Sequence, residues 1–262
     1  MRQMDKNRPA EDLPEDRLEG RNPILEALKA GRPINKLYVQ KIQGKPDPTL
    51  ARIVREAKDA GAVIMEADRQ VLDQMSVTHG HQGVIAHVAT HEYADLDDVI
   101  ERAKARGEDP FLIILDELKE SYNLGSVLRI ADAAGVHGII IPKRRSVGLD
   151  AAVAKASAGA IEHVPVVRVV NLSQTIDELK HQGFWIAGTD SDGQSDYHEI
   201  DWRGPMAIVI GSEGEGMGQQ MKKQCDFLLA IPQRGKVNSL NAAVATGIIV
   251  FEAMHQRHQP RP

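Results

Sequence analysis

The chain has 262 residues, of which 42% are hydrophobic, and this is enough for one large or two ordinary domains. Its formal net charge of -5 argues against a general polyanion-binding protein, so any contact with nucleic acid must come from local basic patches. Cys225 is the only cysteine, which excludes an internal disulfide and cysteine-rich zinc sites and fits a reducing cytoplasm.

The chain begins with a charged segment that lacks an apolar core. Residues 1–16 resemble neither a signal peptide nor a membrane span. Their low hydrophobicity indicates a disordered lead-in. We therefore expect a cytoplasmic protein with no membrane contact.

Residues 17–90 are predicted to form a small α/β domain. Hydrophobic periodicity indicates helices and strands in alternation: helix 22–31, strand 34–40, helix 48–61, strand 62–67, helix 69–76 and strand 83–89. The next segment, residues 91–108, is polar and charged and is followed by Pro110. We interpret it as a linker that contains one amphipathic helix.

Residues 109–262 are predicted to form a second domain in which apolar runs alternate with helices. The apolar runs are 111–117, 138–143, 162–169, 184–190, 206–213 and 227–232, and the helices are 123–135, 149–160 and 172–183, with a final Ala-rich helix near the end of the chain. Continuous apolar runs of this kind are typical of strands buried on both faces of a parallel sheet. The predicted fold class is α/β, and ligands of such sheets bind at the carboxyl ends of the strands.

Polar or glycine-rich turns follow four of these runs. The residues concerned are Asn123 and Arg129 after the first run, Gly188 and Thr189 after the apolar stretch "FWIA" of the fourth, Gly211 and Glu213 after "MAIVI" of the fifth, and the segment "PQRGKVNSLN" after "FLLAI" of the sixth. Each turn alone has an ordinary explanation, such as a helix cap or a surface ion pair. Their shared position indicates one common site, because glycines let a ligand approach the backbone and Glu213 supplies an obligate acceptor.

Two further clusters allow two interpretations. Asn238, Ser239 and Asn241 crowd the start of the last helix, where one residue is enough to cap the helix and the others could hold an anionic ligand. The basic run of Lys143, Arg144 and Arg145 follows a predicted strand. It is either a solvated loop or a contact with a phosphate backbone.

Several apparent motifs do not complete a site. His79, His81, His87 and His91 lack the helical pairing of a metal centre, so no metal is predicted. "GTDSDGQSD" has its glycine at the fourth position, whereas a calcium loop requires the sixth. The second half also lacks the glycine fingerprint of a dinucleotide-binding oxidoreductase.

Three spaced motifs carry a family resemblance. "NLGSVLRIADAAG", "IVIGSEGEGM" and "IPQRGKVNSLNAAVATG" resemble the three motifs of the SpoU branch of the SPOUT methyltransferases. The likeness extends to "EGRNPILEAL" and "HQGVIA" in the first half, and it is strongest to members that methylate a guanosine ribose 2′-hydroxyl in 23S ribosomal RNA.

The resemblance implies an architecture and a reaction. It implies an RNA-binding first domain similar to ribosomal protein L30e and a SPOUT second domain whose chain threads a deep trefoil knot. It also implies a homodimer whose active sites use both subunits. The cofactor would be S-adenosylmethionine and the partner large-subunit ribosomal RNA. Alternatives are methylation of transfer RNA, resistance-type methylation of ribosomal RNA, and an RNA-binding protein without catalytic activity.

The resemblance also assigns residues. The catalytic set that it implies is Asn123, Arg129, Glu213, Ser239 and Asn241, and the cofactor-binding set is Gly188, Thr189, Gly211, Ile231, Gln233 and Leu240. Separately from the resemblance, the position of Lys143, Arg144 and Arg145 after a predicted strand makes them the candidate RNA-binding residues. The chain departs from the family at Ser121, where a proline is usual, and at Gln233, where Met is common.

Overall fold

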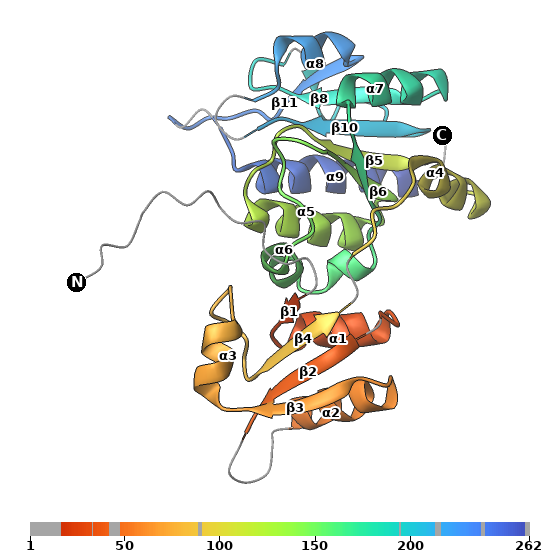
Figure 1. The fold of residues 1–262 in the computed structure, drawn as a ribbon. Coiled ribbons are helices and arrows are strands. Elements are labelled where there is room, and N and C mark those ends of the chain that lie inside the picture. Colours follow the sequence, from red (N-terminus) through yellow and green to blue (C-terminus); the bar gives the residue numbers. More distant parts are fainter. Residues whose placement is uncertain are drawn as a thin grey trace. The chain divides into compact units, whose positions relative to one another are not determined.

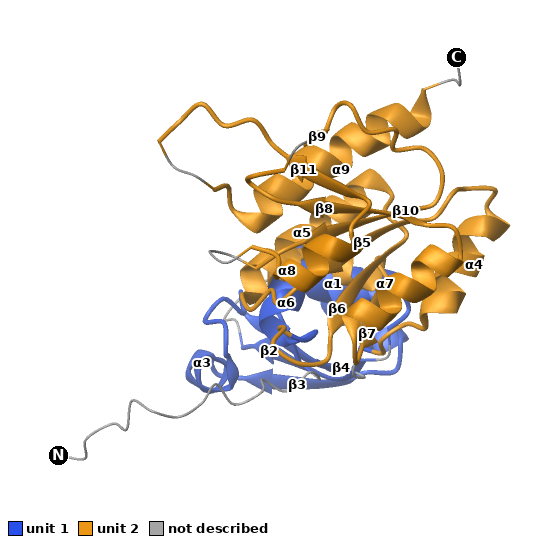
Figure 2. Cartoon of the chain, turned by 90° about the horizontal axis from the view of Figure 1, so that it is seen from above, with its two compact units in different colours: residues 1–91, 148–155 blue, residues 92–147, 156–262 orange. Residues whose placement is uncertain are grey.

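The structure is a computed structural model, and it describes seven stretches of the chain. These are residues 17–32, 34–41, 48–88, 91–193, 195–212, 216–236 and 239–259. The predicted lead-in 1–16, together with Glu213 and Asn238, lies outside them. The chain divides into two compact units, one of residues 1–91 with 148–155 and the other of residues 92–147 with 156–262 (Figure 2).

The first unit is built on a four-stranded sheet with the order β1-β4-β2-β3. Its elements are β1 Arg17–Glu19, α1 Arg21–Lys29, β2 Ile34–Gln40, α2 Pro48–Asp59, β3 Val63–Ala67, α3 Arg69–Met75 and β4 Val84–Val88. Strand β4 is antiparallel to β1 and β2, and β2 is parallel to β3. All six predicted elements are confirmed, and β1 is an addition that pairs along the free edge of β4. Figure 1 shows α1 and α2 together on one side of the sheet and α3 on the other.

Strand β1 ends in a buried carboxylate. Glu19 is fully buried and accepts hydrogen bonds from the Ser76 hydroxyl (2.6 Å), the Thr78 hydroxyl (2.5 Å) and the backbone N–H groups of Val77 and Thr78. Burial alone raises the pKa of Glu19, but these hydrogen bonds together outweigh it and hold the pKa below its ordinary value of 4.5. Lys155 donates to the Thr78 carbonyl and hydroxyl from the segment 148–155.

The second unit contains a seven-stranded sheet in which every pairing is parallel. The strand order is β7-β6-β5-β10-β8-β11-β9. The strands are β5 Phe111–Leu115, β6 Gly138–Pro142, β7 Val166–Val169, β8 Trp185–Thr189, β9 Ser195–Asp196, β10 Met206–Ile210 and β11 Phe227–Ala230. The helices are α4 Leu96–Ala105, α5 Ser121–Ala134, a 3₁₀ turn Ala160–Glu162, α7 Leu172–His181, α8 Gln219–Gln224 and α9 Ala242–His258. Helix α6 Ala151–Ala156 belongs, except for its last residue, to the first unit.

Helices cover both faces of this sheet, as the apolar runs predicted. One face packs Leu112 and Ile114 of β5 against Val99 of α4, Ile176 of α7 and Met221 of α8 in a single apolar cluster. Helices α5 and α9 pack against each other on the opposite face (Figure 1). The central strands β5 and β10 are buried along their whole length.

The amphipathic helix predicted within 91–108 is confirmed as α4, whose apolar side is part of the core. Two other features of residues 109–262 differ from the sequence expectation. The helix expected over 149–160 ends at Ala156 because Ala158 and Gly159 have positive φ angles of 50° and 101°, which end a helix. Strand β9 and helix α8 had no counterpart among the predicted elements.

Candidate active site

A cavity of about 630 Å³ lies at the carboxyl ends of three neighbouring strands. Its walls come from the turns after β8, β10 and β11, from α8 and from the first turns of α9. The lining residues are Thr189–Asp192, Ile210–Ser212, Gly216, Lys222, Leu229, Ile231, Gln233, Ser239–Ala242, Ala245 and Ile249. Five of the six predicted cofactor residues are among them. This is the edge of the sheet at which the sequence placed a ligand.

The sixth predicted cofactor residue, Gly188, lies one position inside β8 and does not line the cavity. A Cβ atom at Gly188 would lie 2.6 Å from Cys225 Sγ and 2.6 Å from Met217 Cε. This glycine therefore makes room for the two sulfur side chains behind the cavity. Burial raises the pKa of the Cys225 thiol to about 12, so the thiol stays protonated and acts as a packing group. The assignment of Gly188 to cofactor binding stays a prediction.

The turn after β10 is closed by backbone pairing. Ser212 and Gly216 form an antiparallel bridge in which each N–H donates to the other carbonyl, at 3.2 and 3.0 Å. Gly211 is required for this closure, because a Cβ there would lie 2.4 Å from the Gly216 carbonyl carbon. Ser212 and Gly216 both line the cavity and flank residues 213–215 in the sequence. The predicted catalytic residue Glu213 itself lies outside the described residues.

The start of α9 shows why its polar residues are crowded. Asn241 is the cap: its Oδ1 accepts from the backbone N–H groups of Ala243 (3.0 Å) and Val244 (3.2 Å). Its Nδ2 donates to Oδ1 of Asn123 at 3.0 Å. Asn123 is only 4% exposed, so one amide both caps the helix and fixes a buried amide of α5. Ser239 is exposed and lines the cavity beside Asn241.

Arg129 is not among the residues that line this cavity. Arg129 lies on the exposed side of α5, six residues after the buried Asn123. It makes no hydrogen bond or ion pair with any residue that the structure describes. Helix α5 begins at Ser121, so a proline is not needed there to start the helix, although proline suits a first turn.

The basic run follows β6 at the same edge of the sheet. Lys143, Arg144 and Arg145 are all exposed, and Arg145 pairs with Glu117 across 2.6 Å. Glu117 and Arg145 both have positive φ, at 59° and 60°. Burial raises the pKa of the neighbouring Asp116, and Glu117 raises it further while Arg145 opposes this.

Asp190 and Lys222 are two lining residues that were not predicted as site residues. Lys222 Nζ lies 2.5 Å from Asp190 Oδ2. A sequence signal existed for Asp190, which directly follows the β8 run beside the predicted Thr189. No signal existed for Lys222, since α8 itself was not predicted.

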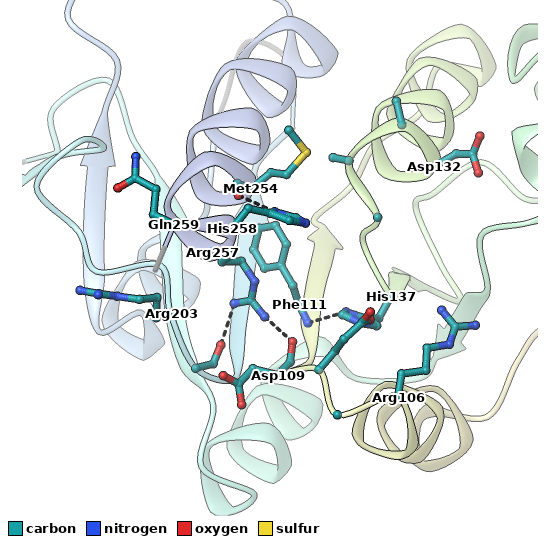
Figure 3. Close-up of a pocket in the computed structure, with 16 residues that line it drawn as sticks. Arg106, Asp109, Phe111, Asp132, His137, Arg203, Met254, Arg257, His258 and Gln259 are labelled. Carbon is teal, nitrogen blue, oxygen red and sulfur yellow. Dashed lines mark hydrogen bonds and ion pairs between the residues drawn. The ribbon is translucent and has the colours of Figure 1, made fainter. Parts of the chain in front are cut away.

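A second cavity, of about 680 Å³, lies at the amino end of β5 (Figure 3). Arg257 of α9 lines it and donates to the carbonyls of Trp202 and Gly204, each at 2.8 Å, and to that of Asp109. Burial lowers the pKa of Arg257, and its three carbonyl partners accept from the guanidinium. His137 pairs with Glu108 at 2.8 Å. These polar groups satisfy one another, which is what a structural anchor of α9 requires.

Three of the four histidines singled out in the first half, His81, His87 and His91, have different contacts. His81 is buried; one ring nitrogen lies 2.9 Å from Asp73 Oδ1, and the other accepts the Gly83 N–H at 3.0 Å. His91 contacts Arg32, and the His87 ring lies against Tyr38. Across the described ranges, His, Cys, Asp and Glu form no group of three or more that could hold a metal ion. Within those ranges, no helix has both the length and the apolarity needed to cross a bilayer.

Comparison with known proteins decides the family. The profile of the SpoU rRNA Methylase family matches residues 110–251, and that of the RNA 2′-O ribose methyltransferase substrate-binding domain matches residues 17–94. The chain is 48% identical over 245 residues to Bacillus subtilis YacO, which is named as a TrmH-family tRNA/rRNA methyltransferase, covering 93% of this chain and 96% of YacO. The chain belongs to the SpoU methylase family. It is an RNA methyltransferase that uses S-adenosylmethionine.

Solved structures of SpoU enzymes have the same fold. The SpoU methyltransferase AviRb from Streptomyces viridochromogenes, in complex with AdoMet, is 26% identical with a TM-score of 0.78; the match covers 94% of this chain and 91% of AviRb. An AdoMet-bound rRNA methyltransferase from Sinorhizobium meliloti is 26% identical with a TM-score of 0.76, covering 91% and 86% of the two chains. The SpoU fold predicted from the motifs is confirmed.

The lining of the first cavity fits S-adenosylmethionine. Its volume lies within the range of about 300–1,000 Å³ that is common for small-molecule sites. Apolar side chains such as Ile210, Ile231 and Leu240 can cover a purine, and Asp190 and Lys222 offer opposite charges to a zwitterion. The donors and acceptors of the glycine-rich turns are backbone groups, which a bound cofactor can approach closely.

Proposed function

We propose that this SpoU enzyme transfers the methyl group to a ribose 2′-hydroxyl, and that its target is a guanosine of 23S ribosomal RNA. The observation that carries the proposal is the junction of two motifs at one cavity. Asn241 caps α9 at the cavity and holds Asn123 of the first motif. The substrate-binding profile over residues 17–94 supports the ribose 2′-oxygen as the acceptor.

The reaction requires alignment more than covalent chemistry from the protein. S-adenosylmethionine supplies a methyl group already activated on a sulfonium. The chain must hold the cofactor in the cavity through Thr189, Gly211, Ile231, Gln233 and Leu240, and orient the ribose oxygen toward it. The amides of Asn123 and Asn241, with Ser239 and Glu213, form the network that we assign to this orientation.

Arg129 has an electrostatic role in this proposal. A guanidinium keeps its charge in proteins, so it serves to hold the target phosphate and to stabilise the oxygen as its proton leaves. Arg129→Lys keeps the charge and removes the planar fork. A pH–rate profile of this variant at saturating cofactor should show a large loss of turnover, and near-normal turnover would show that the fork is not needed.

We further propose a homodimer in which Arg129 serves the partner's cavity. Helix α9 exposes Val244 and Phe251 two turns apart, and the neighbouring α5 exposes Tyr122, which is 74% accessible. Large exposed apolar side chains on two packed helices mark an interaction surface. Arg129 lies exposed on α5 and is not among the residues that line the cavity of its own chain.

Mixing two inactive variants tests this arrangement. Arg129→Ala and Asn241→Ala subunits, unfolded together and refolded, form mixed dimers. If each site takes Arg129 from one subunit and Asn241 from the other, one site in a mixed dimer is intact and activity returns. If both residues act within one subunit, every mixture stays inactive.

The RNA target is testable in cells. The basic run 143–145 supports contact with a phosphate backbone, and we propose that the protein acts in the cytoplasm and that its second domain is knotted. Ribose methylation should be mapped across total RNA from cells with and without the gene. We expect one 23S guanosine to lose its mark and to regain it with the wild-type gene but not with Arg129→Ala. Loss confined to a transfer RNA would refute the ribosomal target.

A further inference from the structure

The cavity has one charged side. Among the lining residues that the structure describes, the charged side chains are Asp190, Asp192 and Lys222. Asp190 and Asp192 belong to the turn after β8, and Lys222 belongs to α8. The remaining described lining residues are apolar, glycine or neutral polar. The cavity therefore distinguishes an uncharged part of a ligand from a charged part.

Asp190 and Lys222 form a close ion pair inside this charged side. Lys222 Nζ lies 2.5 Å from Asp190 Oδ2, and the side chains are only 23% and 10% exposed. An exposed ion pair on a protein surface contributes little to stability. An ion pair that is largely withdrawn from water loses hydration free energy from both charges, so it contributes little net stability. Its position in a ligand cavity indicates that the two charges serve ligand binding.

The two members of the pair are held differently. The Asp190 N–H donates to the Leu229 carbonyl at 2.8 Å, and its carbonyl accepts from the Gly193 N–H at 3.1 Å. Its Oδ1 also accepts from the Asp192 N–H at 3.3 Å. The carboxylate is therefore fixed against β11 and its own turn. Lys222 carries its ammonium on a flexible four-carbon stem, so it can move while the carboxylate stays in place.

We propose that the Asp190–Lys222 pair binds the amino-acid end of S-adenosylmethionine, with Asp190 accepting from the ligand ammonium and Lys222 donating to the ligand carboxylate. This inference rests on the proposed location of the cofactor in this cavity. The ligand end carries an ammonium and a carboxylate on one carbon, so its charges are adjacent and opposite. An adjacent aspartate and lysine present the complementary arrangement.

The rest of the cavity suits the rest of the cofactor. Among the apolar lining residues, Ile210 ends β10, Ile231 directly follows β11, and Leu240 lies two residues before α9. A purine is planar and largely apolar on its faces, and it packs well against such side chains. The described lining residues offer no other cation to a carboxylate, which leaves Lys222 as the partner of the amino-acid end.

Ligand exchange keeps every charge compensated. Without ligand, the aspartate and the lysine neutralise each other, so neither is left as an unpaired charge with little contact with water. With ligand, one protein ion pair is replaced by two charge-assisted contacts, which are stronger than neutral hydrogen bonds. The pair is thus a preformed recognition element that is stable in the free protein.

Two nucleosides separate recognition of the amino-acid end from recognition of the remainder. S-adenosylhomocysteine carries the amino-acid end, and 5′-methylthioadenosine lacks it. Their affinities should be measured by titration calorimetry on the full-length wild type and on Lys222→Met and Asp190→Asn. Lys223→Met is the matched control, because Lys223 is the next residue of α8 and is exposed. Melting curves establish that each variant is folded.

We expect Lys222→Met and Asp190→Asn to weaken S-adenosylhomocysteine about 10- to 100-fold, as expected for loss of a charge-assisted hydrogen bond. Affinity for 5′-methylthioadenosine should stay within about 2-fold, and the control should bind both ligands normally. Equal loss for both ligands, or loss in Asp190→Asn alone, would overturn the inference and indicate contact with the nucleoside. Failure of the folded wild type to bind either ligand would instead refute the location of the cofactor.

Discussion

Replacement of Asn241 separates its two structural duties. Asn241→Ala removes the cap of two N–H groups, which costs about 1 kcal/mol, and it leaves the buried Asn123 oxygen without this donor, which costs about 1–3 kcal/mol more. Asn241→Asp keeps the cap but cannot donate to Asn123, so only the second cost applies. The expected losses are about 2–4 kcal/mol for alanine and about 1–3 kcal/mol for aspartate.

Urea unfolding of the variants measures these losses, with Asn171→Ala as the control. Asn171 caps α7 through the Gln174 N–H at 3.3 Å and lies outside the cavity lining. The control should lose about 1 kcal/mol of stability and bind S-adenosylhomocysteine normally. Both Asn241 variants should bind it more weakly, because they alter the cavity wall.

The comparison between the two Asn241 variants can refute the reasoning. If alanine and aspartate cost the same, the cap contributes nothing. If the aspartate variant is as stable as wild type, the hydrogen bond to Asn123 contributes nothing, and the junction of the two motifs is not held by this contact.

Three further predictions follow from packing and titration. Gly125→Ala should destabilise the fold by about 1–3 kcal/mol, because its Cβ would lie 2.4 Å from the Ala156 Cβ and 2.8 Å from the Ala156 carbonyl carbon. Gly218 has open space around it, so Gly218→Ala should not destabilise the fold, and equal melting temperatures for the two variants would contradict this prediction. Because the pKa of Glu19 is lowered, the Glu19→Gln variant should be less stable than the wild type at neutral pH, and this difference in stability should narrow as the pH falls below 4.5. A difference that stays the same at low pH would show that the ionised form of Glu19 does not stabilise the fold. With its pKa raised to about 12, Cys225 should react slowly with an aromatic disulfide at pH 8 until the protein is unfolded, and equal rates would show an accessible thiolate.

Predictability from the sequence follows the strength of local patterns. The runs that became β5 and β10 are apolar at every position, and both are buried along their length. Strand β1 has only three residues and β9 only two, so their existence depends on pairing with β4 and β11 and not on a local pattern. Helix α8 has six residues, too few to show a helical period.

The site was predictable where motifs lie directly after strands. Thr189 and Gly211 were expected at one edge because parallel strands end together, and both line the cavity. Ile231 also lines it, but the family resemblance, and not its position after a strand, assigned that residue. Lys222 was missed because its approach to Asp190 depends on the pairing of β8 with β11, which no local pattern encodes. Asn241 as the cap of α9 also required the structure, since three neighbouring residues could have filled that position.

The central claim is that this cavity aligns the cofactor with a ribose oxygen of ribosomal RNA. The most direct measurement is methyl transfer by the purified protein from methyl-labelled S-adenosylmethionine to ribosomal RNA of cells that lack the gene, followed by digestion to nucleosides. The account predicts that the label is recovered as 2′-O-methylguanosine. Label on a nucleobase, or no label from folded protein that binds S-adenosylhomocysteine, would contradict it.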